Sequence, residues 1–96
     1  LLSPAGCARA REVQIESTDA VLGFPVKFAY GYAYGNPMFP ITPNENAIWW
    51  AGAGGSVIVI DEDNRMCFSY VMNQMKAALI GDQRSASVAQ ALYASL

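Results

Sequence analysis

The sequence predicts a small α+β fold in which an antiparallel sheet carries one helix at its C-terminal end. Two β-rich runs, residues 56–60 and 66–72, flank the polar segment Asp61-Glu62-Asp63-Asn64-Arg65. A short polar connection between two such runs is typical of an antiparallel hairpin. Farther on, Asp82 is a favourable helix-capping residue. Apolar residues at helical spacing follow it and predict a helix packed on the sheet, namely Val88, Ala89, Leu92, Tyr93 and Leu96.

Residues 26–34 are predicted to form one continuous strand. Aromatic side chains occupy one parity of this segment, at Phe28, Tyr30, Tyr32 and Tyr34. Small residues occupy the other parity, so one face of the strand would be aromatic and the other nearly bare. A bare face lets a helix pack closely or a ligand approach the backbone. Before this strand, residues 8–15 fit a half-buried strand slightly better than a helix, because polar and apolar side chains alternate there.

Two further segments complete the expected architecture. Residues 36–46 contain three prolines and three asparagines and are predicted to form an irregular surface loop. Residues 57–60 are apolar on both parities, which is typical of a strand covered on both faces. The sheet is therefore expected to be a middle layer between two others.

The composition is unusually apolar for a small domain. Of the 96 residues, 53 % are hydrophobic and 15 % are charged, whereas globular domains average about 45–50 % and about 25 %. The excess predicts apolar surface that is covered by a partner, by a second copy or by the rest of a longer chain. We favour the last and expect residues 1–96 to be part of a larger domain, in keeping with a first residue that is Leu1 rather than Met.

Charge and residue usage exclude several classes of function. A net charge of −2 with scattered basic residues gives no electrostatic surface for nucleic acid, and no apolar run approaches the ~20 residues of a membrane helix. The absence of histidine excludes Ser-His-Asp triads and histidine-based zinc sites built from this chain alone. Cys7 and Cys67 lie far apart, without metal-ligand spacing, which favours a reducing compartment such as the cytoplasm and leaves the question open.

The most informative segment is Trp49-Trp50-Ala51-Gly52-Ala53-Gly54-Gly55-Ser56. Its glycines do not match a dinucleotide-binding fingerprint, because they lead into a strand rather than follow one and open a helix. No Gly-Lys-Ser/Thr follows, so a P-loop is excluded as well. The segment therefore either presents backbone amides to another kind of ligand or forms a close structural crossing. Elsewhere, Asp61-Glu62-Asp63 is predicted to be a solvated hairpin tip, and Tyr34-Gly35-Asn36 a turn rather than a catalytic element.

The order of these features resembles the C-terminal part of the serine β-lactamase-like family, which includes class C β-lactamases, penicillin-binding proteins and related esterases. The resemblance covers most of residues 19–96. Its pieces are Val21-Leu22-Gly23-Phe24-Pro25, Trp50-Ala51-Gly52-Ala53-Gly54-Gly55-Ser56, Val59-Ile60-Asp61, Tyr70-Val71-Met72-Asn73-Gln74-Met75 and the closing helix. It implies that the sheet and helix belong to a larger three-layer α/β fold.

The resemblance also implies an activity and a set of site residues. Family members are hydrolases that act on esters or amides through an acyl-enzyme, without a cofactor or metal. Trp50-Ala51-Gly52 falls on the family's third sequence element, which binds substrate, and Trp50 would shape the pocket without transferring a proton. The backbone N–H of Ala53 would then form half of the oxyanion hole. A tryptophan in place of lysine suggests substrates without an obligatory carboxylate.

The sequence departs from the family in two places. No serine is followed three residues later by lysine, and the Tyr34 element lies at the wrong place relative to the strand. The chain is therefore expected to be inactive alone and to need the N-terminal part of the same protein. Two alternatives remain: a non-enzymatic α+β module whose aromatic surface binds a partner or ligand, and a family member that has lost catalysis.

Overall fold

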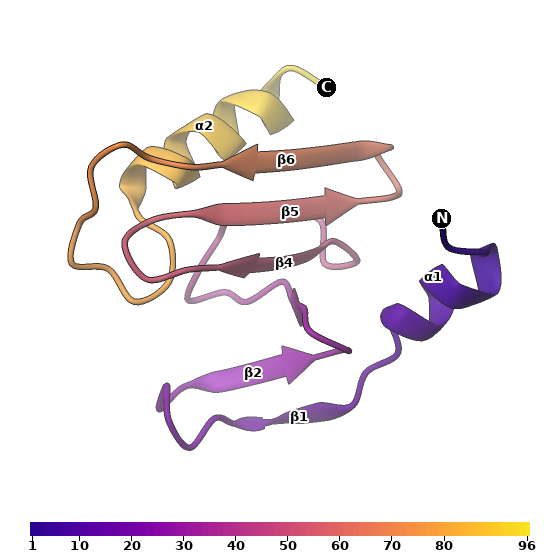
Figure 1. Cartoon of the computed structure of the whole chain (residues 1–96). Helices are drawn as coiled ribbons and strands as arrows, with labels where there is room; N and C mark the ends of the chain where they lie inside the picture. Colours follow the sequence, from indigo (N-terminus) through magenta and orange to yellow (C-terminus); the bar gives the residue numbers. More distant parts are fainter.

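The computed structural model describes residues 1–96 as a six-stranded antiparallel meander with a helix at each end of the chain (Figure 1). Each strand pairs with the next one along the chain, so the strand order follows the sequence. The elements are α1 (Pro4–Ala10), β1 (Ile15–Thr18), β2 (Pro25–Phe28), β3 (Ala33–Tyr34), β4 (Ile48–Ala51), β5 (Val57–Asp61), β6 (Met66–Tyr70) and α2 (Gln83–Ala94). The predicted α+β class, the β5–β6 hairpin and the C-terminal helix are confirmed. Neither helix has the length and apolar character that a membrane crossing requires.

The prediction of one strand over residues 26–34 is wrong. The segment turns back on itself, so that β2 and β3 form a hairpin in which Phe28 pairs with Ala33. Gly31 sits in the turn with a φ of 86°, a conformation that costs glycine little, and the Ala29 N–H donates to the Tyr32 carbonyl at 2.8 Å. The aromatic residues therefore do not share one face of one strand.

The N-terminal segment also differs from the prediction of a strand over residues 8–15. It opens with α1, whose cap is Ser3: the serine hydroxyl accepts from the Gly6 N–H at 3.1 Å, and proline occupies the first helical turn. Ser-Pro is a favourable helix start, and this local capping favours a helix over the predicted strand in this segment. The expected strand begins only at Ile15.

One face of the central strands forms the hydrophobic core. Trp49 of β4 pairs with Val59 of β5, and Val59 pairs with Phe68 of β6, so these side chains lie on the same face. Helix α2 packs there through Ala89, which is 1 % exposed and belongs to the same cluster as Val59. The sheet thus has one helical layer, on the side where Figure 1 shows α2 lying along β6.

The opposite face of these strands is only partly covered. Trp50 and Ile58 form one pair across it and are half-buried, while Cys67 and Ser69 of β6 are exposed. Helix α1 buries none of its residues and supplies no second layer. These 96 residues therefore supply one of the two layers expected to cover the sheet, and the expectation of a second layer stays a prediction.

The end of β5 carries a buried carboxylate. Asp61 is fully buried, so the prediction that it belongs to a solvated tip is wrong, whereas Glu62 and Asp63 beside it are exposed. Asn64 and Asn44 donate hydrogen bonds to Asp61 at 2.8–3.0 Å, and the Tyr93 hydroxyl donates at 2.8 Å. These bonds lower the pKa of Asp61 against the opposing effect of burial and tie α2 to the end of the sheet.

Candidate active-site wall

Residues 52–56, which we call the glycine turn, connect β4 to β5. The Gly52 N–H donates to the Ser56 carbonyl at 2.9 Å, and the Gly55 N–H donates to the Gly52 carbonyl at 3.2 Å. Gly54 and Gly55 have φ values of 100° and 122°, which side-chain-bearing residues rarely adopt. The glycines are therefore required by the backbone path of this turn.

The space around the turn imposes the same requirement. A Cβ atom on Gly54 would lie 2.6 Å from the Met75 side chain, and one on Gly55 would lie 2.6 Å from an Asp82 carboxylate oxygen. The backbone of Gly54 is also bonded on both sides: its N–H donates to the Ala78 carbonyl at 3.0 Å, and its carbonyl accepts from the Lys76 N–H at 3.2 Å. The turn is thus packed against the segment that leads from β6 to α2.

Ala53 differs from its neighbours in this turn. Among residues 52–55, the three glycines each donate a backbone hydrogen bond within the chain, whereas the Ala53 N–H donates none. Ala53 is also exposed, although Gly54 and Gly55 are buried. An unpaired backbone N–H in an exposed residue is the kind of group that can stabilise a developing oxyanion.

The residues predicted to bind substrate lie directly before Ala53 at the end of β4. Trp50 is half-buried, and its ring packs on Phe28 with centroids 4.9 Å apart. Ala51 is 7 % exposed as a whole residue and belongs to the core cluster, so it offers little surface to a ligand. Because β3 pairs only with Ile48 and Trp49, the β3-facing edge of β4 has no strand partner from Trp50 onward.

A shallow hollow of about 360 Å³ adjoins this strand end. Its apolar lining includes Trp50, Ile58 and Val71, and Ser56 and Ser69 also line it. No charged residue is among those that line it. The hollow therefore offers shape and weak hydroxyl contacts, without an ionic partner for a carboxylate.

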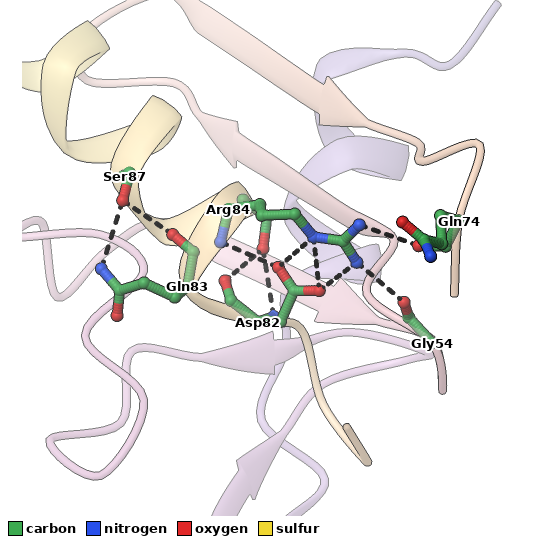
Figure 2. A network of polar contacts seen from close by, with 7 residues as sticks. Gly54, Gln74, Asp82, Gln83, Arg84 and Ser87 are labelled. Carbon is green, nitrogen blue, oxygen red and sulfur yellow. Dashed lines mark hydrogen bonds and ion pairs between the residues drawn. The ribbon is translucent and has the colours of Figure 1, made fainter. Parts of the chain in front are cut away.

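The structure adds two residues that contact the glycine turn, Asp82 and Arg84, and the sequence prediction did not place them there (Figure 2). Asp82 caps α2 as expected, in a capping box with Ser85, but it also forms an ion pair with Arg84. The hydrogen bond from Arg84 lowers the pKa of Asp82 to about 2. An arginine in the first turn of a helix is disfavoured by the helix dipole, and this is the sequence signal that could have pointed to a specific partner.

Tyr34, which the sequence predicts to lie in a turn rather than in a catalytic element, makes its contacts away from the glycine turn. Its hydroxyl donates to the Arg11 carbonyl at 2.5 Å, and the Lys27 ammonium lies 5.3 Å from the centre of its ring. The structure therefore brings Trp50, Gly52 and Ala53 together but adds no acid–base group to them.

Comparison with known proteins rests on solved structures, since no family model and no curated protein matches the sequence. A family VIII carboxylesterase superposes with a TM-score of 0.91 and 28 % identity. A penicillin-binding protein homolog from Caulobacter crescentus superposes with a TM-score of 0.90 and 35 % identity. Each match covers 99 % of this chain and 26 % of the other. Both proteins are members of the serine β-lactamase-like family, so the expected resemblance to that family is confirmed, and the chain spans about a quarter of the length of these two relatives.

Proposed function

We propose that these 96 residues are the C-terminal part of a serine hydrolase that acts on esters or amides through an acyl-enzyme. In this proposal the chain supplies the strand of the third sequence element and the oxyanion-side wall of the active site. The nucleophilic serine and its lysine come from the N-terminal part of the same protein, and the chain is inactive alone.

The observation that carries the proposal is the Ala53 N–H. It is unpaired in an exposed residue of a turn whose three glycine amides are bonded, and it directly follows Trp50-Ala51-Gly52. In acyl transfer, the attack of a serine oxygen on a carbonyl places negative charge on the carbonyl oxygen, and two backbone N–H groups can stabilise it. Ala53 supplies one of them, and the nucleophile's own N–H supplies the other.

The lining of the site favours uncharged substrates. Trp50 has no proton to exchange at physiological pH, so proton transfer falls to residues outside the chain. The hollow beside Trp50 contains no charged residue. We therefore expect a neutral ester or amide as the substrate, in line with one relative being a carboxylesterase.

Two other functions remain candidates on specific observations. The partly bare sheet face around Trp50 and Ile58 would also suit a non-enzymatic module that binds a partner. The lack of a Ser-x-x-Lys sequence would also suit a family member that has lost catalysis. Both predict that the full-length protein forms no acyl-enzyme.

The test is covalent labelling of the full-length protein with a fluorophosphonate, followed by peptide mapping and by hydrolysis assays with p-nitrophenyl butyrate. The proposal predicts one labelled serine outside residues 1–96 and turnover that the label abolishes. The 96-residue chain expressed alone should show neither. A label on a serine of this chain, or a full-length protein with neither label nor turnover, would contradict the proposal.

A further inference from the structure

The guanidinium group of Arg84 is engaged by partners at all three of its nitrogens. Nε contacts both carboxylate oxygens of Asp82 at 3.0–3.2 Å, and Nη1 donates to the Gln74 carbonyl at 2.8 Å. Nη2 donates to Asp82 as well and makes a longer contact of 3.5 Å with the Gly54 carbonyl. Figure 2 shows this side chain reaching from α2 to the backbone of Gln74 and Gly54. None of the three nitrogens is left unpartnered for a substrate.

These contacts join three separate parts of the chain. Gln74 belongs to the segment after β6, Gly54 belongs to the glycine turn, and Asp82 with Arg84 opens α2. The first two parts are already linked through the backbone of Gly54, which bonds to Lys76 and Ala78. Arg84 therefore fixes the glycine turn to the helix across a bonded intermediate segment.

The carboxylate of Asp82 also limits where the turn can move. It lies where a Cβ atom on Gly55 would be 2.6 Å from its Oδ2, and its side chain is only 9 % exposed. Held by Arg84, this carboxylate packs directly against the backbone of Gly55. The turn is thus restrained on one side by hydrogen bonds and on the other by contact.

We propose that Arg84 is a positioning residue that, together with Asp82, holds the glycine turn in the conformation that leaves the Ala53 N–H free for the oxyanion. This role rests on the proposed function of Ala53. Arg84 acts through the turn and touches neither substrate nor reacting atoms. Helix α2 is in this way part of the support of the active-site wall.

The role is separable from helix capping. The cap is made by the Arg84 backbone N–H, which donates to Asp82 Oδ1 at 2.8 Å, and by the hydroxyl of Ser85. Replacing the Arg84 side chain leaves both interactions in place. Arg84→Ala therefore removes the restraint on the turn without removing the start of α2.

The experiment compares Arg84→Ala, Arg84→Lys and Gln83→Ala in the full-length protein. Two quantities are measured: hydrogen exchange of the Gly54, Gly55 and Lys76 amides, and the separate kcat and KM for p-nitrophenyl butyrate. Gln83→Ala is the matched control, because it removes an exposed side-chain bond to Ser87 in the same helical turn.

For Arg84→Ala we expect exchange of the Gly54, Gly55 and Lys76 amides to rise about tenfold or more. We expect kcat to fall by about 10- to 100-fold with KM little changed, because a small misplacement of a reacting-site donor is costly. Arg84→Lys should recover part of both, since lysine can pair with Asp82 but cannot fork to Gln74 and Gly54. Gln83→Ala should match the wild type.

Unchanged exchange at the turn in Arg84→Ala would overturn the positioning role, whatever the activity. Faster exchange with unchanged kcat would also overturn it, because the restraint would then serve stability alone. Absence of turnover and label in the wild type overturns the proposed function instead, while the exchange data still decide whether Arg84 restrains the turn.

Discussion

The two turns that flank β5 are built in opposite ways. The glycine turn at its start leaves the N–H of the exposed residue Ala53 unpaired. The hairpin tip at its end, residues 61–65, is organised around Asp61, which is fully buried and accepts four hydrogen bonds. One turn preserves an unused donor, and the other satisfies a buried acceptor. The difference accords with the proposed oxyanion role of the first turn and with a stabilising role for the second.

Helix α2 holds both turns, one from each end. Arg84 in its first turn contacts the backbone of Gly54, and Tyr93 in its last turn donates to Asp61 at 2.8 Å. Changes at the tip should therefore lower stability. Changes at the glycine turn should lower activity by more than their effect on stability explains.

The largest stability effect is expected for Asp61→Ala. It leaves the amides of Asn44 and Asn64 and the hydroxyl of Tyr93 without their shared acceptor, so the free energy of unfolding should fall by about 3–4 kcal/mol. Denaturant unfolding of the full-length protein, followed by tryptophan fluorescence, measures this. Asp63→Ala is the control: Asp63 also accepts from Asn44 but is exposed, and it should cost much less. Equal losses in the two variants would contradict a dominant role for the buried carboxylate.

Gly55→Ala should come next and should affect activity as well. The added Cβ meets the Asp82 carboxylate at a φ of 122°, and the free energy of unfolding should fall by about 2–3 kcal/mol from strain and displacement together. Turnover should fall roughly tenfold or more as the turn shifts. Unfolding and ester hydrolysis assays measure the two effects.

Gly23→Ala is the matched control for this variant. Gly23 also has a positive φ, 77°, but a Cβ there would meet no atom within 4 Å. Its cost should be about 1–2 kcal/mol from the backbone alone, with turnover unchanged. If both variants lost activity equally, the glycine turn would have no special relation to the site.

Tyr93→Phe should have a smaller effect with a distinct pH dependence. Loss of the hydroxyl should cost about 1–2 kcal/mol at neutral pH, because Asp61 and Thr42 each lose a partner. Burial, and the hydrogen bond to Asp61, raise the pKa of Tyr93 from 10.0 to about 12. As the pH rises, the Tyr93 hydroxyl therefore loses its proton at a lower pH in the unfolded chain than in the folded one. The stabilisation by the protonated hydroxyl is complete below pH 10 and is lost between pH 10 and 12.

Unfolding experiments across this range test the assignment. The wild type should lose stability from pH 10 toward pH 12 more steeply than Tyr93→Phe, in which this group cannot ionise. Parallel pH profiles would show that the Tyr93 proton is not held by the folded structure.

The smallest effect is expected at Arg65 in the hairpin tip. Arg65 is the one residue other than glycine with a positive φ, 52°, and Arg65→Gly should raise the free energy of unfolding by up to about 1 kcal/mol. Arg65→Ala keeps the strained backbone, so it measures the effect of losing the arginine side chain apart from the effect of relieving the strain. If glycine stabilised no more than alanine, backbone strain would not limit the tip.

Much of this arrangement could be predicted from the sequence, because it depends on local patterns. The β5–β6 hairpin follows from two β-rich runs around a polar segment, and α2 follows from Asp82 and its apolar stripe. The turn at Gly31 was missed because tyrosines on both sides continue the alternation of a strand. The burial of Asp61 was missed because Asn44 and Tyr93, which satisfy it, are remote in sequence.

The candidate site likewise has features that follow from local sequence patterns and features that depend on residues remote in sequence. Trp50-Ala51-Gly52-Ala53 could be located by its residues, since glycines beside a strand mark a special backbone path. The unpaired state of the Ala53 N–H among bonded glycines, and the proposed restraint of the turn by Arg84, depend on hydrogen bonds between segments 10 to 30 residues apart. No local pattern specifies such contacts.

The most direct test of the central claim is the acylation rate constant of the full-length protein in single turnovers with p-nitrophenyl butyrate, compared between Ala53→Pro and Ala53→Ser. Proline removes the N–H, whereas serine keeps it. We predict that Ala53→Pro acylates about 100- to 1000-fold more slowly, with Gly54 and Gly55 amides still protected from exchange, and that Ala53→Ser acylates at a rate close to the wild type. Acylation at the wild-type rate in Ala53→Pro would contradict the assignment of Ala53 as an oxyanion donor.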